Sequence, residues 1–259
     1  MSPTKGPISR EIYTQRVLHY LYDWVVLGSN MKYLWRCPTR SVLLPFFQEN
    51  FSANHLDCGV ASGYFPAACL RSSSSINNNN NLNQKGVQRL ALLDFNPNCL
   101  RTTERIIRSQ QASSGSRRKV ELQCVEADVT APLPQALLQD ARMFSSISMF
   151  NVLHCVPGGM THKLQSFRNL ARVLDPHEGV LTGCTVLGEP YATWRLGRLG
   201  LRHMNRVGVF HSLGDNREEI EKALDEAFEE VQTWLVGMVL LFKARKPRKL
   251  LGKDVLSEE

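Results

Sequence analysis

The chain has 259 residues, of which 43% are hydrophobic and 21% charged, and its formal net charge is +7. This composition is typical of one globular α/β domain and excludes a disordered or fibrous chain. Residues 1–15 contain no apolar signal-peptide core and no apolar run reaches the ~18 residues of a membrane span, so the sequence predicts a soluble cytoplasmic protein.

Strand-like and helix-like segments alternate along the chain. Expected strands lie near residues 54–58, 88–94, 119–127, 145–153 and 179–186, and expected helices near 63–70, 97–110, 134–141, 160–174 and 216–230. The alternation predicts an α/β fold, a mostly parallel sheet with helices on both faces. The last apolar segment fits two strands joined by a tight turn at Gly237, although one long strand is also compatible. Two strands would give seven in all, with one antiparallel strand near the end.

Three segments lie outside this pattern. Residues 1–50 carry aromatic side chains at partly helical spacing and are expected to form a helical cap on the domain of residues 51–247. Residues 71–86, RSSSSINNNNNLNQKG, form a low-complexity run that we interpret as a disordered loop insertion. Residues 188–214, between the fifth strand and the last helix, are a candidate lid.

The cysteines and the positive charge exclude several kinds of site. The seven cysteines are odd in number and never spaced as C-x-x-C, which favours buried thiols over disulfides, and no metal site is predicted. Much of the positive charge lies near the end of the chain, where residues 248–259 form a basic and acidic tail. We therefore interpret the charge as a solvated tail and not as a nucleic-acid surface.

Acidic residues stand at the ends of three expected strands. Asp57 ends the first strand in HLDCGVASGYF, residues 55–65, and is followed by a glycine-containing turn. With the insertion removed, Asp94 lies about 20 residues after that turn, where an acid that binds ribose hydroxyls is expected. Asp128 follows the third strand, at a place suited to an exocyclic amine, and the amide of Val129 is available to a ring nitrogen. Together these residues predict an adenosine site.

The turn after the first strand favours a cationic ligand. It reads D-x-G-x-x-S-G, and its carboxylate would repel the diphosphate that a G-x-G-x-x-G turn binds. S-adenosylmethionine carries an ammonium, a sulfonium, a ribose and an adenine, and it needs no phosphate site. It therefore fits these residues better than a nicotinamide dinucleotide.

Four motifs occur in one order: HLDCGVASGYF at 55–65, LLDFN at 92–96, ADV at 127–129 and HCVPG at 154–158. On these motifs, residues 23–245 resemble the class I S-adenosylmethionine-dependent methyltransferases, and within them the small-molecule methyltransferases of fungal secondary metabolism. The resemblance implies a Rossmann-like domain that methylates an O or N atom of a small, largely apolar natural product. Ala61 and Ser62 depart from the family pattern, which has Gly and Thr, and Ala61 adds a methyl group next to the ligand.

The resemblance also implies roles for single residues. Asp57 would hold the methionine ammonium, Asp94 the ribose diol and Asp128 the adenine amino group, while Phe95 would lie against the adenine. The expected cofactor-binding residues are Asp57, Gly59, Ala61, Gly63, Asp94, Phe95, Asn96, Asp128, Val129 and Asn151.

The segment MFNVLHCVPGGM follows the fourth strand, beside the expected position of the methyl group. His154 is the candidate general base for a hydroxyl acceptor, and a histidine bonded to the backbone is the alternative. His203 and His211 are rival bases, whereas Cys155 has no supporting motif and is interpreted as a buried thiol. The expected substrate-binding residues are Tyr22, Trp24, Trp194, His203 and Asn205.

Two other functions remain compatible with the sequence. A nucleic-acid methyltransferase is suggested by the net charge, but no N-P-P-Y motif follows the fourth strand. A cofactor-binding protein that no longer methylates is suggested by Ala61 and by the uncertain base. The leading hypothesis has a small-molecule acceptor and no membrane partner.

Overall fold

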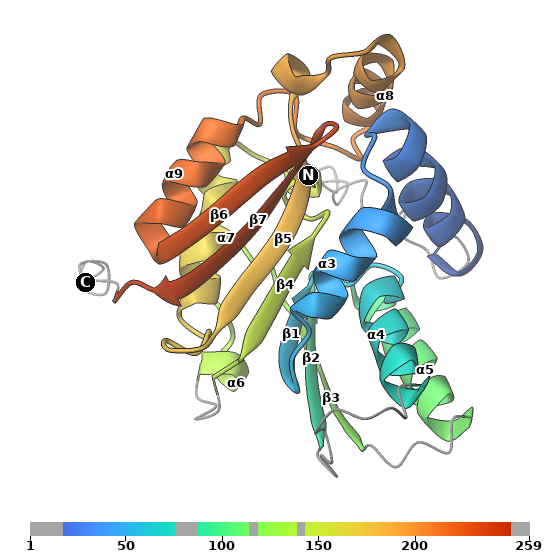
Figure 1. Ribbon diagram of the computed structural model, residues 1–259, viewed down its shortest axis with the longest axis vertical. Helices are drawn as coiled ribbons and strands as arrows, with labels where there is room; N and C mark the ends of the chain where they lie inside the picture. Colours follow the sequence, from blue (N-terminus) through green and yellow to red (C-terminus); the bar gives the residue numbers. More distant parts are fainter. Residues whose placement is uncertain (1–17, 76–86, 114–118, 139–142, 250–259) are drawn as a thin grey trace, which may run out of the picture.

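The structure is a computed structural model that describes residues 18–75, 87–113, 119–138 and 143–249. A sheet with the strand order β3-β2-β1-β4-β5-β7-β6 crosses the molecule (Figure 1). Its strands are β1 (Asn54–Cys58), β2 (Gln88–Asp94), β3 (Val120–Glu126), β4 (Ser146–Phe150), β5 (Val180–Val186), β6 (Phe228–Val236) and β7 (Val239–Pro247). Only β7 runs against its neighbours in this sheet, which confirms the predicted fold class.

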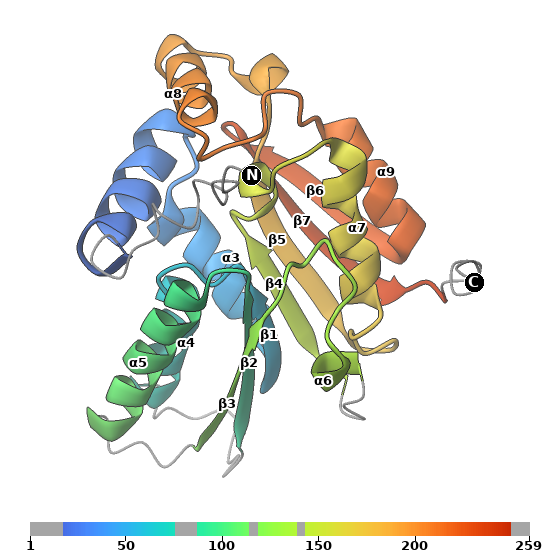
Figure 2. The same cartoon turned by 180° about the vertical axis from the view of Figure 1, so that it is seen from behind.

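Helices cover both faces of the sheet, as the two opposite views show (Figures 1 and 2). On one face lie α6 (Gln135–Leu138), α7 (Met160–Ala171) and α9 (Arg217–Ala227). On the other lie η1 (Leu18–Leu34), η2 (Thr39–Leu43), α3 (Leu44–Glu49), α4 (Tyr64–Ser75) and α5 (Pro97–Ser113). Helix α8 (Arg195–Arg206) lies beside η1, and the short helical turns η3 (Leu153–Cys155) and η4 (Glu189–Tyr191) follow β4 and β5.

The two hydrophobic cores arise from the alternation of side chains along the strands. In β2, Leu90 and Leu92 belong to the core under α4 and α5, whereas Ala91 and Leu93 belong to the core under α7 and α9. All seven residues of β2 are buried. Because β2 is buried on both faces, residues 90–93 form a continuous apolar run in the sequence.

The end of the chain forms two strands and not one. Gly237 occupies the turn between β6 and β7 with φ +61°, and a Cβ atom there would lie 2.2 Å from the carbonyl oxygen of Trp35. Met238 N–H donates to that same carbonyl oxygen at 2.9 Å. The turn therefore requires glycine both for its left-handed backbone and for its close approach to the N-terminal segment.

Several predicted boundaries were wrong. The expected helix 216–230 ends at Ala227, and residues 228–230 already belong to β6. The fourth strand ends at Phe150 and not near residue 153. Helix α4 continues to Ser75, so the first residues of the expected loop 71–86 are helical, while residues 76–86 lie outside the described residues. The expected helix 134–141 is described only as α6.

Further sequence expectations concern the cysteines and the membrane. Five cysteines, at 37, 58, 69, 99 and 184, are buried as expected, but Cys124 is exposed and Cys155 is half-buried. Among the described residues, no helix has both the length and the apolar character that crossing a bilayer requires. The tail from residue 250 onward lies outside the described part of the chain.

Candidate active site

A cleft opens at the carboxyl ends of the parallel strands. The strand order changes direction between β1 and β4, and ligands of open α/β sheets bind at such a switch point. The cleft is lined by Gly59, Ala61, Leu93, Asp94, Phe95, Asn96, Cys99, Ala127, Asp128, Val129, Asn151, Val152, Cys155, Val156 and Pro157. Most of the predicted cofactor-binding residues are therefore brought together here.

A smaller cavity adjoins the cleft. The two share Gly59, Ala61 and Asn151, and the cavity adds Asp57. Its other lining residues are Leu27, Val60, Ser62, Tyr64, Phe65 and Phe150. A ligand that fills both spaces would thus extend from the end of β3, past β2, to the end of β1.

The turn after β1 is held in a left-handed conformation. Gly59 has φ +72°, and a Cβ atom on it would lie 2.3 Å from Cγ2 of Val152. Its N–H donates to the carbonyl oxygen of Leu93 at 2.7 Å. Ala61, where the family pattern has glycine, also has a positive φ of 47° and still lines both spaces. The alanine therefore leaves the turn in place.

Gly63 does not line the cleft or the cavity. It has φ +76°, and a Cβ atom on it would lie 2.7 Å from the side chain of Thr103 on α5. The expected role of this glycine was to let the ligand approach the backbone. The structure instead shows a packing role, since Gly63 lets the start of α4 approach α5.

The two acids beside the cleft are buried. Asp94 Oδ1 accepts a hydrogen bond from the N–H of Asn96 at 2.8 Å, and Oδ2 accepts one from the N–H of Ala61 at 3.4 Å. Burial raises the pKa of Asp94 to about 6 and that of Asp57 to about 7. The negative charge of Asp94 also raises the pKa of Asp57, whereas a hydrogen bond from Ser148 lowers it. A cation bound between these acids would stabilise their charged forms.

Two further polar residues border the cleft. Asp128 is exposed, and its Oδ1 accepts hydrogen bonds from the N–H and the hydroxyl of Thr130 at 2.8 and 2.6 Å. Asn151 follows β4 with φ +59°, a left-handed conformation that asparagine tolerates. Its buried Nδ2 has no hydrogen-bond partner among the described residues, so it is available as a donor where cleft and cavity meet.

Comparison with known proteins gives the relatives of this fold. An O-methyltransferase, NEC2, from Pyricularia oryzae is 45% identical over 92% of this chain and 92% of its own length. Methyltransferase verB from Penicillium polonicum is 38% identical over 92% of this chain and 98% of its own. The chain belongs to this family of fungal methyltransferases. A physcion biosynthesis cluster O-methyltransferase from Aspergillus chevalieri is 35% identical to this methyltransferase over 96% of the chain. No protein-family model matches the chain.

Solved structures share the fold of this methyltransferase at low identity. An O-methyltransferase family protein from Burkholderia thailandensis has a TM-score of 0.55 at 16% identity and covers 91% of the chain. Human N-acetylserotonin methyltransferase, solved in complex with S-adenosylmethionine, has a TM-score of 0.53 at 14% identity and covers 95% of it. The chain spans only 63% and 60% of these two proteins. These likenesses confirm the Rossmann-like fold, and the fungal relatives confirm a small-molecule methyltransferase over the nucleic-acid alternative.

His154 occupies a buried position between β4 and β5 of the methyltransferase. The backbone N–H of Val186 donates to His154 Nδ1 at 3.1 Å, and the ring centroid lies 4.2 Å from that of Phe210. Burial, followed by the charge of Lys163, lowers the pKa of His154 to about 3. Because a backbone N–H can only donate, Nδ1 is the acceptor and Nε2 carries the hydrogen. These contacts favour the structural role that the sequence left open.

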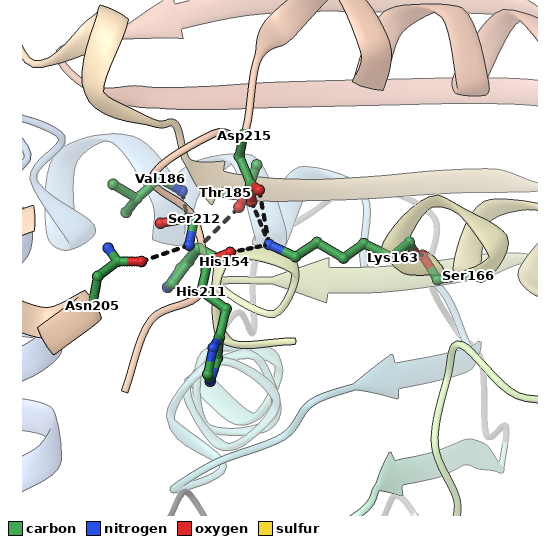
Figure 3. Close-up of polar contacts among 9 residues, drawn as sticks. All are labelled: His154, Lys163, Ser166, Thr185, Val186, Asn205, His211, Ser212 and Asp215. Carbon is green, nitrogen blue, oxygen red and sulfur yellow. Dashed lines mark hydrogen bonds and ion pairs between the residues drawn. The ribbon is translucent and has the colours of Figure 1, made fainter. Parts of the chain in front are cut away.

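His211 lies next to His154 on the segment between α8 and α9 (Figure 3). Its backbone N–H donates to the carbonyl oxygen of His154 at 2.8 Å, and its own carbonyl oxygen accepts from Nζ of Lys163 at 2.7 Å. Lys163 also contacts both carboxylate oxygens of Asp215 at 2.8 Å, and the two side chains are almost fully buried. The imidazole of His211 itself is exposed and points away from this ion pair.

The predicted substrate-binding residues are spread over η1 and α8. Trp24 is 73% exposed, and His203 is also exposed. Trp194 donates from Nε1 to the carbonyl oxygen of Leu34 at 3.0 Å, so its polar group is engaged within the fold. Asn205 accepts the N–H of Ser212 and donates to the carbonyl oxygen of Leu201, both at 2.8 Å. The side chain of Tyr22 lies outside the described residues.

Sequence reasoning missed Lys163 and Asp215. The only signal in the sequence is a lysine on the apolar side of the helix that spans residues 160–171, and such a lysine is usually interpreted as partly solvated. Its partner stands 52 residues later, in a segment without a motif. Pairing at this separation is visible only in the folded chain.

Proposed function

We propose that the protein transfers a methyl group from S-adenosylmethionine to a hydroxyl oxygen of a small, largely apolar acceptor. The observation that carries the proposal is the pair of buried acids, Asp57 and Asp94, on neighbouring strands beside one cleft. Each carboxylate accepts hydrogen bonds from the protein, but burial still raises the pKa of both, so their ionised forms gain from a further partner. The cation and the ribose hydroxyls of this cofactor are suitable partners, and the O-methyltransferase names of two relatives support oxygen as the methylated atom.

The residues present fit the cofactor. In the cleft, Asp94 would hold the ribose diol, Phe95 would lie against the adenine, and Asp128 with the Val129 amide would receive its polar edge. In the cavity, Asp57 would hold the ammonium group. When bound, the cofactor supplies a methyl group attached to a positively charged sulfur. The protein then has two tasks, which are to align the acceptor and to remove its proton.

His211 is the residue that we assign to the proton. Burial and then the nearby charge of Lys163 lower the pKa of this histidine, so its ring is neutral near pH 7. Its backbone is fixed on both sides, by His154 and by Lys163, while its ring is exposed. A fixed backbone with an exposed neutral imidazole suits a general base better than the buried ring of His154.

The cavity beside Asp57 has largely apolar walls. Leu27 of η1 lines it together with Tyr64, Phe65 and Phe150. Apolar and aromatic walls with a few polar groups are typical of sites for small organic molecules.

Two experiments test the proposal together. One is calorimetry with S-adenosylmethionine, and the other measures the transfer of a labelled methyl group to a panel of hydroxylated aromatic compounds. Binding of the cofactor with label on an acceptor oxygen supports it. Absence of cofactor binding by a protein that melts cooperatively would overturn it. Label on a nitrogen or carbon atom would retain the methyltransferase and refute the assignment to oxygen.

The base is tested by His211→Ala, with His177→Ala as a matched control. His177 is an exposed histidine that precedes β5, at the opposite end of the sheet from the cleft. We expect His211→Ala to lower kcat by about 10²–10⁴-fold with unchanged cofactor affinity, and the control to keep its kcat. Equal kcat in both variants would remove His211 from the reaction.

A further inference from the structure

A continuous chain of hydrogen bonds runs inside the sheet to Asp57. Ser52 N–H donates to Ser146 Oγ at 3.0 Å, and Ser146 Oγ lies 2.6 Å from Nδ1 of His55. Nε2 of His55 lies 2.9 Å from Ser148 Oγ, which donates to Asp57 Oδ1 at 2.5 Å. His55, Ser146, Ser148 and Asp57 are each at most 4% exposed. We call Ser146, His55, Ser148 and Asp57 the relay.

The relay has two consistent directions, and an ionised Asp57 allows only one of them. A carboxylate only accepts, so an ionised Asp57 requires Ser148 to donate to it and the ring to donate to Ser148 from Nε2. Nδ1 of His55 then accepts from Ser146. A protonated Asp57 that carries its hydrogen on Oδ1 allows the reverse direction, in which it donates to Ser148, Ser148 donates to Nε2, and Nδ1–H donates to Ser146. The ring remains neutral in both cases, because burial lowers the pKa of His55 to about 3.

We propose that the relay couples the charge on Asp57 to the tautomer of His55, so that His55 and Ser148 are positioning residues which present Asp57 to the cationic end of the cofactor. The inference rests on the proposed function in one respect, namely that a cation binds in the cavity lined by Asp57. The effect of the relay is on cofactor binding.

In the part of the chain that the structure describes, no cationic side chain contributes to the pKa of Asp57. The titratable groups that face it there are Asp94 from β2 and Cys69 from α4, with Cys58 and His55 on its own strand. Asp94 is itself acidic, and burial keeps both thiols protonated by raising their pKa. The countercharge for an ionised Asp57 therefore comes from the ligand. Binding of a cation selects the direction of the relay in which Nε2 of His55 carries the hydrogen.

Nuclear magnetic resonance of the full chain with ¹⁵N-labelled histidine tests the coupling directly. The two ring nitrogens of His55 report its tautomer, and His55→Gln assigns the signals by their disappearance. In the cofactor-free protein, we expect the hydrogen to move from Nδ1 to Nε2 as the pH rises through about 7. At about pH 6, S-adenosylmethionine should cause the same move without a change of pH.

The two arms of this experiment separate the inference from the proposed function. A tautomer that stays constant over this pH range would overturn the relay, whatever the cofactor does. If the tautomer follows pH but calorimetry detects no cofactor binding, the proposed function fails and the coupling stands. If calorimetry shows that the cofactor binds but the tautomer of His55 does not change, the role of Asp57 towards the cation is refuted.

Ser148→Ala and Ser166→Ala test the effect on affinity. Ser166 is a fully buried serine on α7 whose hydroxyl donates to the carbonyl oxygen of Lys163, outside the relay. Without the Ser148 hydrogen bond, the ionised form of Asp57 loses stabilisation. We expect cofactor affinity at pH 7 to fall about tenfold and its pH midpoint to rise by about one unit, with no midpoint change in Ser166→Ala. An unchanged midpoint in a folded Ser148→Ala protein would contradict the proposal.

Discussion

The buried ion pair between Lys163 and Asp215 allows a quantitative test of what fixes His211. The side chains of Lys163 and Asp215 are 1% and 5% exposed, and Nζ uses its three hydrogens on the two oxygens of Asp215 and on the carbonyl oxygen of His211. Lys163→Met keeps the apolar length of the side chain but leaves a carboxylate buried without a partner. Breaking such a pair costs about 3–5 kcal/mol of the free energy of unfolding.

The double variant Lys163→Met with Asp215→Asn should cost less than Lys163→Met alone, because no unpaired charge is left behind. Arg168→Met is the control, since Arg168 pairs with Glu226 at a site where the side chains are 56% and 44% exposed. An exposed pair of this kind contributes about 0–1 kcal/mol. Urea denaturation of the four proteins, analysed with a common slope, gives the differences in the free energy of unfolding.

A loss below about 1 kcal/mol in Lys163→Met would refute the reasoning, because it would mean that water or a proton compensates Asp215 at little cost. The kinetic side of the same test is a lower kcat with unchanged cofactor affinity, measured where the variant is still folded. This split distinguishes misplacement of His211 from a general loss of structure.

Three further predictions concern the cleft. Asp94→Ala should weaken S-adenosylmethionine binding by about 1–3 kcal/mol in calorimetry, since the ribose hydroxyls lose a charged acceptor, and equal affinity would remove Asp94 from the site. Gly59→Ala should destabilise the fold by about 1–3 kcal/mol in urea denaturation, because φ is +72° and the new methyl group would lie 2.3 Å from Val152. Adding Val152→Ala should recover part of this loss, and no recovery would contradict the clash. In the cofactor-free protein, burial raises the pKa of Asp57 from 3.8 to about 7, so between these pH values the folded chain holds a proton that the unfolded chain has lost. The free energy of unfolding, compared with that of Asp57→Asn, should therefore fall by roughly 2–4 kcal/mol as the pH rises from about 4 to 7. The comparison with Asp57→Asn is needed because His55 and His154, with pKa values lowered to about 3, act in the opposite direction; a difference that is flat or rises with pH would refute the shift.

The sequence was most informative where a local pattern decides the structure. Asp57 and Asp94 stand near the ends of two parallel strands, whose carboxyl ends lie at one edge of the sheet, so the sequence brought both acids to this edge, where Asp94 lines the cleft and Asp57 the adjoining cavity. Gly63 shows the limit of a motif. A glycine that admits a ligand and one that admits a neighbouring helix look the same in sequence, and only the position of Thr103 distinguishes them.

The role of the histidines depends on partners far away in the chain. His154 follows its strand as expected, but the N–H of Val186, 32 residues later, fixes Nδ1 as the acceptor. His55 stands within a recognised motif, yet its hydrogen-bond partners Ser146 and Ser148 belong to β4, more than 90 residues away. Sequence patterns specify the strands, whereas the pairing of β1 with β4 specifies which side chains meet.

The contact between the β6–β7 turn and Trp35 has a consequence for how the protein is made. Four residues of the N-terminal segment share one hydrophobic core with the β6–β7 turn and with β7. They are Leu27, Met31, Trp35 and Cys37, and the turn and strand contribute Met238, Val239 and Leu241. Leu27, which lines the cavity beside Asp57, belongs to that segment. During synthesis, the segment that contains Leu27 therefore has to wait for β7 before it can pack, so the apolar wall of the cavity forms late in folding.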